Sequence, residues 1–393
     1  MSEQKTNRVA KLVLGAFILL AAGVLYAWSI LNKPLETCGV AAPDLQFAFT
    51  VALCSFCIGG LISGLLAKKL SICVRMLIAA VLSCAGFCLV STYQSSPAVI
   101  VLGYGVLAGA GIGIVYNVVI AATGAWFPDK KGICTGVLMM AFGFSGLVIG
   151  KAATSMFAIS EDSWRMTYRA LGLLLLVIFG VSAFLLKQPE TAKKPLGTDE
   201  DLDTKQMLKQ ISFWKLFLFF ILLAAVGSTA IGFGRRYFEA VGLTTETAVT
   251  VAGLLSIFNG LGRIVSGTLF DKCGLRKTML LTSAVAVTAP LLALVASATT
   301  SGWLGIVGLF LCAFSYGFSP TMSAAAVSAF YGSRYFALNF SVLNLVLIPA
   351  SFMSTLAGSL VESSGGYVST FVVLVAASAV GLLINLTLFV KKK

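Results

Sequence analysis

Histidine is absent from this chain of 393 residues, and acidic residues are scarce, with 15 Asp and Glu in total. Without histidine, the close pair Cys54 and Cys57 lacks the ligands that would complete a zinc site, and we interpret the cysteines as small buried hydrophobes. Charged residues make up only 11% of the chain, whereas they make up about a quarter of a soluble domain. The composition therefore excludes a soluble globular protein and predicts neither a metal site nor a cofactor.

Hydrophobic residues, in contrast, make up 58% of the chain, and the mean hydropathy is +0.97. Apolar runs close to the ~20 residues that cross a bilayer occur twelve times. They cover approximately residues 10–31, 46–67, 72–92, 97–125, 132–157, 166–187, 213–238, 245–270, 277–297, 302–330, 335–361 and 366–390. The sequence therefore predicts an all-α membrane protein with twelve transmembrane helices.

The 28 Lys and Arg residues give a net charge of +13. Two of them lie within spans and five lie near loops on one side, which leaves 21 of the 28 on the side that holds both termini. The five are Lys33, Arg165, Arg169, Arg235 and Arg236. Because cytoplasmic loops carry the excess of basic residues, we expect both termini in the cytoplasm. The basic residues thus signal topology, and we exclude nucleic-acid binding.

Residues 188–212 form the one extended polar segment, rich in Pro, Asp, Glu and Lys. This predicted cytoplasmic linker divides the chain into two six-span bundles, 1–187 and 213–393. A weak repeat supports the division, because residues 267–277 read GTLFDKCGLRK after span 8, and residues 64–75 form a basic connection of similar length, without Asp, after span 2. Two like halves predict a substrate site between them near the membrane midplane.

Arg263 lies near the middle of the eighth span, in the stretch SIFNGLGRIVSG. A guanidinium stays protonated in any surroundings, and the sequence places no Asp or Glu beside it at that depth. Asn259 precedes it by four residues and shares its helix face. The alternative is a side chain extended to the cytoplasmic headgroups, but Arg263 lies eight residues before Asp271, about 12 Å at the helical rise. The pattern therefore predicts a water-filled cavity, an anionic ligand, or both.

Several stretches resemble known transporters. Residues 267–277 resemble the G-x-x-x-D-R/K-x-G-R/K-R/K connection that follows span 2 or span 8 in the major facilitator superfamily, and the copy at Gly64 is degraded. Three further stretches are similar to the oxalate/formate antiporter family, relatives of the monocarboxylate transporters. These are GVLYAWSILNKP (23–34), GAGIGIVYN with WFPDKKG (109–117 and 126–132), and FNGLGR (258–263).

The resemblance implies two pseudo-symmetric six-helix bundles and gives Arg263 the role of binding the substrate carboxylate. Oxalate-exchanging members add a Lys in span 11, and a gapless count from the pattern at 331–339 places Leu347 at that position. Monocarboxylate transporters commonly have an Asp in the place of Asn259, where it helps proton coupling. If protons move here, the candidate carriers are the substrate, a water or Glu239.

Three tyrosines, Tyr26, Tyr116 and Tyr316, fall in spans 1, 4 and 10, which line the cavity in this superfamily. A phenol can donate a hydrogen bond to a carboxylate while its ring limits substrate length. Aromatic residues within spans also serve as packing, and the sequence leaves both readings open.

Other residues are candidates for a second charge or for conformational control. Lys151 either supplies a second cation or extends to the outer surface, and Arg235 or Arg236 is placed to pair with Glu239. The predicted conformational motif comprises Gly267, Asp271, Gly274 and Arg276. Gly105, Gly109 and Gly113 form a small-residue ridge for close helix packing, and Pro320 and Pro349 are expected to bend spans 10 and 11.

We therefore predict a secondary active transporter of small organic anions, in particular a monocarboxylate of the formate, lactate, pyruvate or acetate class. It is expected to act without enzymatic activity, by alternating access, as an antiporter or proton-linked symporter. Its partners are the small carboxylate and the lipid bilayer, and it works as a monomer in the cytoplasmic (inner) membrane. An oxalate or other dicarboxylate exchanger is the main alternative. A transporter-like sensor would need a signalling domain and a multidrug pump a membrane-embedded acid, and we find neither.

Overall fold

The computed structural model consists of helices, and its described part contains no strand. The described residues are 2–92, 96–160, 162–189, 201–299, 301–364 and 366–389. Ten helices among them are long and apolar enough to cross a membrane. One of the ten, Thr245–Thr299, contains two helices joined at Gly274, and a shorter apolar helix covers Phe336–Phe352. With these two additions, the prediction of twelve spans in an all-α membrane protein is confirmed.

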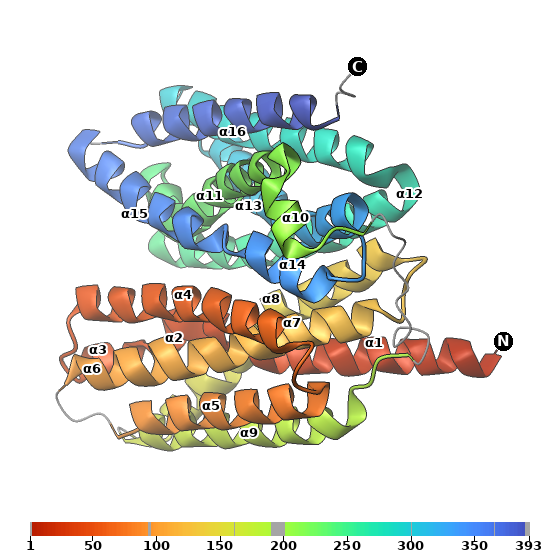
Figure 1. The fold of residues 1–393 in the computed structure, drawn as a ribbon. Helices are drawn as coiled ribbons and strands as arrows, with labels where there is room; N and C mark the ends of the chain where they lie inside the picture. Colours follow the sequence, from red (N-terminus) through yellow and green to blue (C-terminus); the bar gives the residue numbers. More distant parts are fainter. Residues whose placement is uncertain are drawn as a thin grey trace. The chain divides into compact units, whose positions relative to one another are not determined.

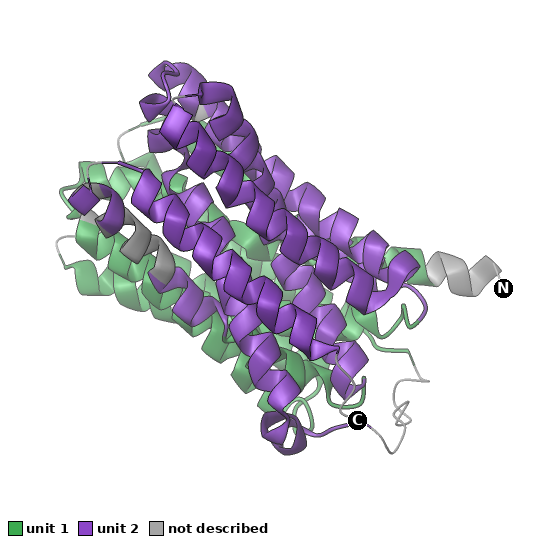
Figure 2. Cartoon of the chain, turned by 90° about the horizontal axis from the view of Figure 1, so that it is seen from above, with its two compact units in different colours: residues 1–128, 141–199, 333–345 green, residues 129–140, 200–332, 346–393 purple. Residues whose placement is uncertain are grey.

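The chain divides into two compact units, which Figure 2 colours separately. Unit 1 comprises residues 1–128, 141–199 and 333–345, and unit 2 comprises residues 129–140, 200–332 and 346–393. Each unit thus includes a short segment from the other predicted half of the chain. That the bundles 1–187 and 213–393 move as two bodies during transport stays a prediction. Of the predicted linker, residues 190–200 lie outside the described residues.

Unit 1 contains most of the first six spans and α14, the first part of span 11 (Figure 1). Its helical elements are α1 (Ser2–Ala22), η1 (Gly23–Ala27), α2 (Trp28–Leu31), α3 (Lys33–Thr37), α4 (Ala42–Leu66), α5 (Ile72–Val90), α6 (Pro97–Ile100), η2 (Val101–Ala108), α7 (Gly109–Gly124), most of α8 (Lys131–Phe157), α9 (Ser163–Leu185) and α14 (Phe336–Asn344). A Cβ on Gly109 would lie 2.6 Å from the carbonyl oxygen of Ala52, and one on Gly113 would overlap the carbonyl of Phe56. The close helix packing predicted for this ridge is therefore confirmed between α7 and α4.

The first span is not one uninterrupted α-helix, although its sequence is continuously apolar. It passes from α1 through the 3-10 turn η1 into α2. Tyr104 Oη donates to the carbonyl of Leu25 at 3.0 Å, and Tyr168 Oη donates to that of Leu31 at 2.8 Å. Backbone groups at membrane depth must be satisfied within the protein, so these phenols stabilise the irregular turn.

Unit 2 contains the last six spans except α14, together with the start of α8. Its helices are α10 (Thr204–Lys209), α11 (Ile211–Ala240), α12 (Thr245–Thr299), α13 (Gly302–Tyr331), α15 (Leu347–Ser364) and α16 (Val368–Leu388), with residues 131–140 of α8. Gly274 divides α12 with a φ of +78°, a left-handed conformation that favours glycine. Phe233, Tyr237 and Phe371 pack their rings together in the core between α11 and α16.

Span 11 is broken, and Pro349 explains where. Helix α14 ends at Asn344 and α15 begins at Leu347. Proline has no N–H to donate to the carbonyl four residues earlier, that of Leu345, and its ring crowds the same carbonyl. The bend expected from Pro349 therefore takes the form of a break one turn before it, whereas Pro320 lies inside the continuous helix α13.

Candidate functional site

Arg263 lies on α12 inside unit 2, with 2% of its surface exposed. Its Nη1 donates a hydrogen bond to the backbone carbonyl of Met139 on α8. The helices can come this close because Gly136 has no side chain, and a Cβ there would lie 2.6 Å from the Arg263 carbonyl oxygen. Thr321 on α13 donates its hydroxyl to the same carbonyl at 3.3 Å. Helices α8 and α13 thus pack against Arg263, and its burial argues against a side chain extended to the surface.

Asn259 lies one turn before Arg263 on α12, and Tyr316 lies on the neighbouring helix α13. The Asn259 amide oxygen is buried and has no hydrogen-bond partner among the described residues, so it is an available acceptor. A side chain on Gly317 of α13 would overlap the Asn259 carbonyl, which shows how closely α13 approaches α12 there. The neighbouring Tyr316 packs the base of its side chain against Gly227 of α11. Arg263 and Asn259 therefore share one turn of α12, whereas Tyr316, in the same unit, packs toward α11.

The other two predicted binding residues, Tyr26 and Tyr116, lie in unit 1 and share an aromatic neighbour. The ring centroid of Phe142 on α8 is 5.3 Å from that of Tyr26 and 5.2 Å from that of Tyr116. Phe56 on α4 completes the group, 5.0 Å from Tyr116 and 5.9 Å from Phe142. Tyr26 is 37% exposed and Tyr116 is 5% exposed, so Tyr26 is the more accessible phenol of this aromatic cluster.

Sequence reasoning missed Phe56 and Phe142, because an apolar ring within a span is ordinarily interpreted as packing. It also missed Gly136 and Met139. The available signal was the spacing of Gly132 and Gly136 on α8, four residues apart, which is the same pattern that predicted the ridge in span 4.

The candidates for a second charge are closer to the surface. Lys151 on α8 is exposed. On α11, Arg235 Nε lies 3.1 Å from Glu239 Oε1, and their side chains are 57% and 32% exposed. The expected partner of Glu239 is thus Arg235, although such an exposed pair contributes little stability.

The predicted conformational motif joins α12 to the start of α8. Asp271 accepts hydrogen bonds from two backbone amides, Gly132 at 2.9 Å and Ile133 at 2.7 Å. A side chain on Gly267 would overlap the carbonyl of Gly132, so the two glycines allow this approach. Arg276, the last residue of the motif, is exposed. The carboxylate therefore satisfies amides at the positive end of the α8 dipole.

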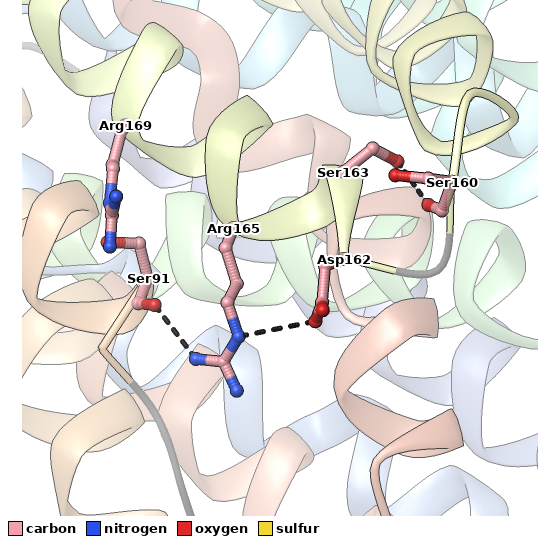
Figure 3. Close-up of polar contacts among 6 residues, drawn as sticks. All are labelled: Ser91, Ser160, Asp162, Ser163, Arg165 and Arg169. Carbon is pink, nitrogen blue, oxygen red and sulfur yellow. Dashed lines mark hydrogen bonds and ion pairs between the residues drawn. The ribbon is translucent and has the colours of Figure 1, made fainter.

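Two arginines predicted on the outer side serve a structural contact in unit 1 (Figure 3). Arg165 donates from Nη1 to the carbonyl of Ser91 at 3.0 Å, and its Nε lies 3.7 Å from Asp162 Oδ1. Arg169 Nε donates to the Ser91 hydroxyl at 3.1 Å. Both cations thus bind Ser91, the residue that follows the carboxyl end of α5. The helix dipole favours positive charge at that end.

Comparisons with known proteins agree with this architecture. The pattern of the Major Facilitator Superfamily matches residues 12–351. An oxalate:formate antiporter of Oxalobacter formigenes is 26% identical over 373 residues, which are 93% of this chain and 88% of the relative. The apicoplast pyruvate carrier 1 of Toxoplasma gondii is 23% identical over 310 residues, 63% of this chain and 56% of the relative.

Solved structures of transporters share the fold. The fucose:proton symporter of Escherichia coli has a TM-score of 0.76 at 14% identity, with coverage of 98% of this chain and 99% of that one. A proton:xylose symporter has a TM-score of 0.72 at 14% identity, with coverage of 98% and 97%. From the helices, the family match and these structures, we conclude that this chain is a multi-pass membrane protein that belongs to the Major Facilitator Superfamily.

Proposed function

We propose that this chain is a secondary active transporter of small organic anions, and that its cargo is a monocarboxylate of the formate, lactate, pyruvate or acetate class. The observation that carries the proposal is Arg263, a guanidinium buried in a membrane-spanning helix one turn from Asn259. Its planar pair of donors matches the two oxygens of a carboxylate, and the Asn259 amide can bind a further oxygen through its N–H groups. The oxalate:formate antiporter and the pyruvate carrier among its relatives support a small carboxylate.

The choice of one carboxylate over two rests on the other cations. Leu347, at the position of the Lys in oxalate-exchanging relatives, is an apolar residue at the start of α15. Lys151 is exposed, and Arg235 is paired with Glu239. Arg75 is also buried but donates to the carbonyl of Ser63, which leaves Arg263 as the buried cation of the proposed site, matched in charge by one carboxylate. The second candidate, an oxalate or other dicarboxylate exchanger, is supported by the relative that is 26% identical.

The proposed cycle is alternating access, in which bundle 1–187 rocks against bundle 213–393 about the bound anion. We place both termini in the cytoplasm, the protein in the cytoplasmic membrane and the working unit as a monomer, on the distribution of Lys and Arg and the behaviour of the family. Tyr26, Tyr116 and Tyr316 are proposed to contact the cargo, and Glu239 is the proposed side-chain proton carrier if transport is proton-linked.

The decisive test is Arg263→Ala in proteoliposomes, with uptake and counterflow of radiolabelled lactate, pyruvate, formate and oxalate. We expect transport to be lost, because the only buried two-pronged donor in the proposed site is removed. Arg263→Lys keeps the charge and is expected to bind at least about tenfold more weakly, because a lysine lacks the planar fork. Normal transport by an Arg263→Ala protein with an unchanged size-exclusion profile would refute the function.

Leu347→Lys separates the two cargo classes. If Leu347 marks the lost second cation, this variant gains oxalate binding while its affinity for lactate falls or stays the same. The matched control is Leu345→Lys, two residues earlier at the break between α14 and α15. Strong oxalate transport by the unmodified protein would instead favour the exchanger.

A further inference from the structure

The Arg263 guanidinium already has an acceptor in the structure, the backbone carbonyl of Met139. Because this contact uses Nη1, one of the guanidinium donors that would bind cargo, we infer that the Met139 carbonyl takes the place of one oxygen of the cargo carboxylate when no cargo is bound. Gly136 is then a positioning residue, since its missing side chain lets α8 reach Arg263. This inference rests on the proposed function and adds a control on when the carrier can move.

A carbonyl on a helix has two lone pairs, so Met139 can accept a guanidinium bond while it keeps its place in α8. The bond is charge-assisted on the donor side only. A carboxylate adds a full negative charge and two oxygens that can accept parallel N–H bonds from the guanidinium, whereas the carbonyl offers one neutral oxygen. An arriving carboxylate therefore displaces the carbonyl, whereas a neutral solute of the same size does not.

The displaced contact helps to hold the start of α8 against α12. The cap that Asp271 provides to Gly132 and Ile133, eight residues along α12 from Arg263, holds the same segment. Residues 129–140 belong to unit 2, whereas the rest of α8 belongs to unit 1. Loss of the Met139 contact leaves the start of α8 with the Asp271 cap and the close packing of Gly132 on Gly267. Cargo binding thus weakens the hold on this segment, and the empty carrier keeps it.

The consequence is a preference for exchange over net transport. An empty carrier has both contacts and must break them without compensation before residues 129–140 can leave α12. A loaded carrier has already replaced one contact with the bond to cargo. The geometry therefore favours reorientation of the loaded form, which is the behaviour of an antiporter.

Native Cys134 reports on this segment, because it lies between Gly132 and Gly136 with 0% of its surface exposed. Its rate of labelling by N-ethylmaleimide, resolved by peptide mass spectrometry on the full chain in proteoliposomes, measures release of α8. Cys312 on α13, also 0% exposed, reports general unfolding in the same sample. Saturating formate or pyruvate is expected to raise labelling of Cys134 about tenfold or more, as for loss of one hydrogen bond to a charged group, and to leave Cys312 unchanged.

Gly136→Ala tests the positioning role without cargo. Its added methyl group moves α8 away from the Arg263 backbone, so labelling of Cys134 is expected to be high in the empty protein and to rise little further with carboxylate. The ratio of net efflux to exchange should rise in the same variant. Gly180→Ala on α9 is the matched control, because nothing lies within 4 Å of a Cβ at that position.

Two outcomes overturn the inference. One is a carboxylate that binds, as shown by calorimetry, but leaves Cys134 labelling unchanged. The other is a folded Gly136→Ala protein whose empty form labels like the unmodified chain. If no carboxylate of the panel binds, the proposed function fails, and the Gly136→Ala comparison on the empty protein still decides whether the Met139 contact restrains α8.

Discussion

The two related connections after spans 2 and 8 carry opposite charges at the same position, four residues after their first glycine. In unit 2, Asp271 caps the start of α8 by accepting from Gly132 and Ile133. In unit 1, the residue at the same spacing from its glycine is Lys68, whose Nζ lies 4.7 Å from the ring centroid of Tyr335, the residue before α14. One helix start is therefore capped by an anion, and the other faces a cation that its dipole disfavours.

Local sequence explains why the caps matter. The residue before α8 is Lys130, which has no side-chain acceptor, so the helix depends on Asp271 from another span. Tyr335 before α14 likewise makes no side-chain capping bond. Unit 1 holds α14 by other means, a hydrogen bond of 2.9 Å from Asn117 Nδ2 to the carbonyl of Ala337 and the close approach of Gly64. The comparison teaches that a repeated motif can keep its geometry while losing its electrostatic function.

The largest expected effect comes from removing the anionic cap. Asp271→Asn keeps the size of the side chain but presents an NH₂ group to one of the two amides, and each lost bond to a charged acceptor costs about 1.5–3 kcal/mol. We expect amide hydrogen exchange at Gly132 and Ile133 to accelerate about tenfold or more, measured by mass spectrometry. Asp162→Asn, at a carboxylate whose side chain is 91% exposed, is the control for charge alone. Unchanged exchange in a folded Asp271→Asn protein would contradict the capping role.

A smaller effect is expected from giving unit 1 the missing anion. Lys68→Asp places an acceptor where Asp271 stands in the other connection, and an N-terminal cap contributes about 1 kcal/mol. Exchange at the first amides of α14 should therefore slow by roughly fivefold, and transport should slow with it if α14 moves in the cycle. Lys69→Asp, the same charge change one residue along, should leave the amides of α14 unaffected. Equal slowing in both variants would assign the effect to surface charge and not to a cap.

The sequence predicts part of this arrangement because some features are local. The motif places Gly274 between spans 8 and 9, where the structure has a left-handed turn, and the bend expected in span 11 follows from the missing N–H of Pro349. The number of spans follows from hydropathy alone. The irregular turn in span 1 could not be predicted, since Tyr104 and Tyr168 that stabilise it come from distant spans.

The candidate site also has features that the sequence predicts and features that it does not. The burial of Arg263 and its shared face with Asn259 follow from position and helical period. Its acceptor, the Met139 carbonyl, is a backbone group that every residue has, so only the distance between α8 and α12 singles it out. Phe142 likewise becomes the shared neighbour of Tyr26 and Tyr116 through the rotation of α8, which an apolar sequence does not specify.

The smallest expected effect is at the ring beside Lys68. Tyr335→Leu removes a cation–π contact that contributes about 0.5–1 kcal/mol at an exposed site, so exchange at the start of α14 should accelerate by roughly twofold to fivefold. Tyr335→Phe keeps the ring and should change nothing. Arg334 also lies near this ring, 5.5 Å from its centroid, so Lys68→Gln combined with Tyr335→Leu is needed to isolate the lysine. If Lys68→Gln removes the difference between Leu and Phe at this position, the lysine supplies the contact. If the difference persists, Arg334 supplies the contact with the ring. Lys68, at the position that Asp271 has in the other connection, then makes no cation–π contact that stabilises α14.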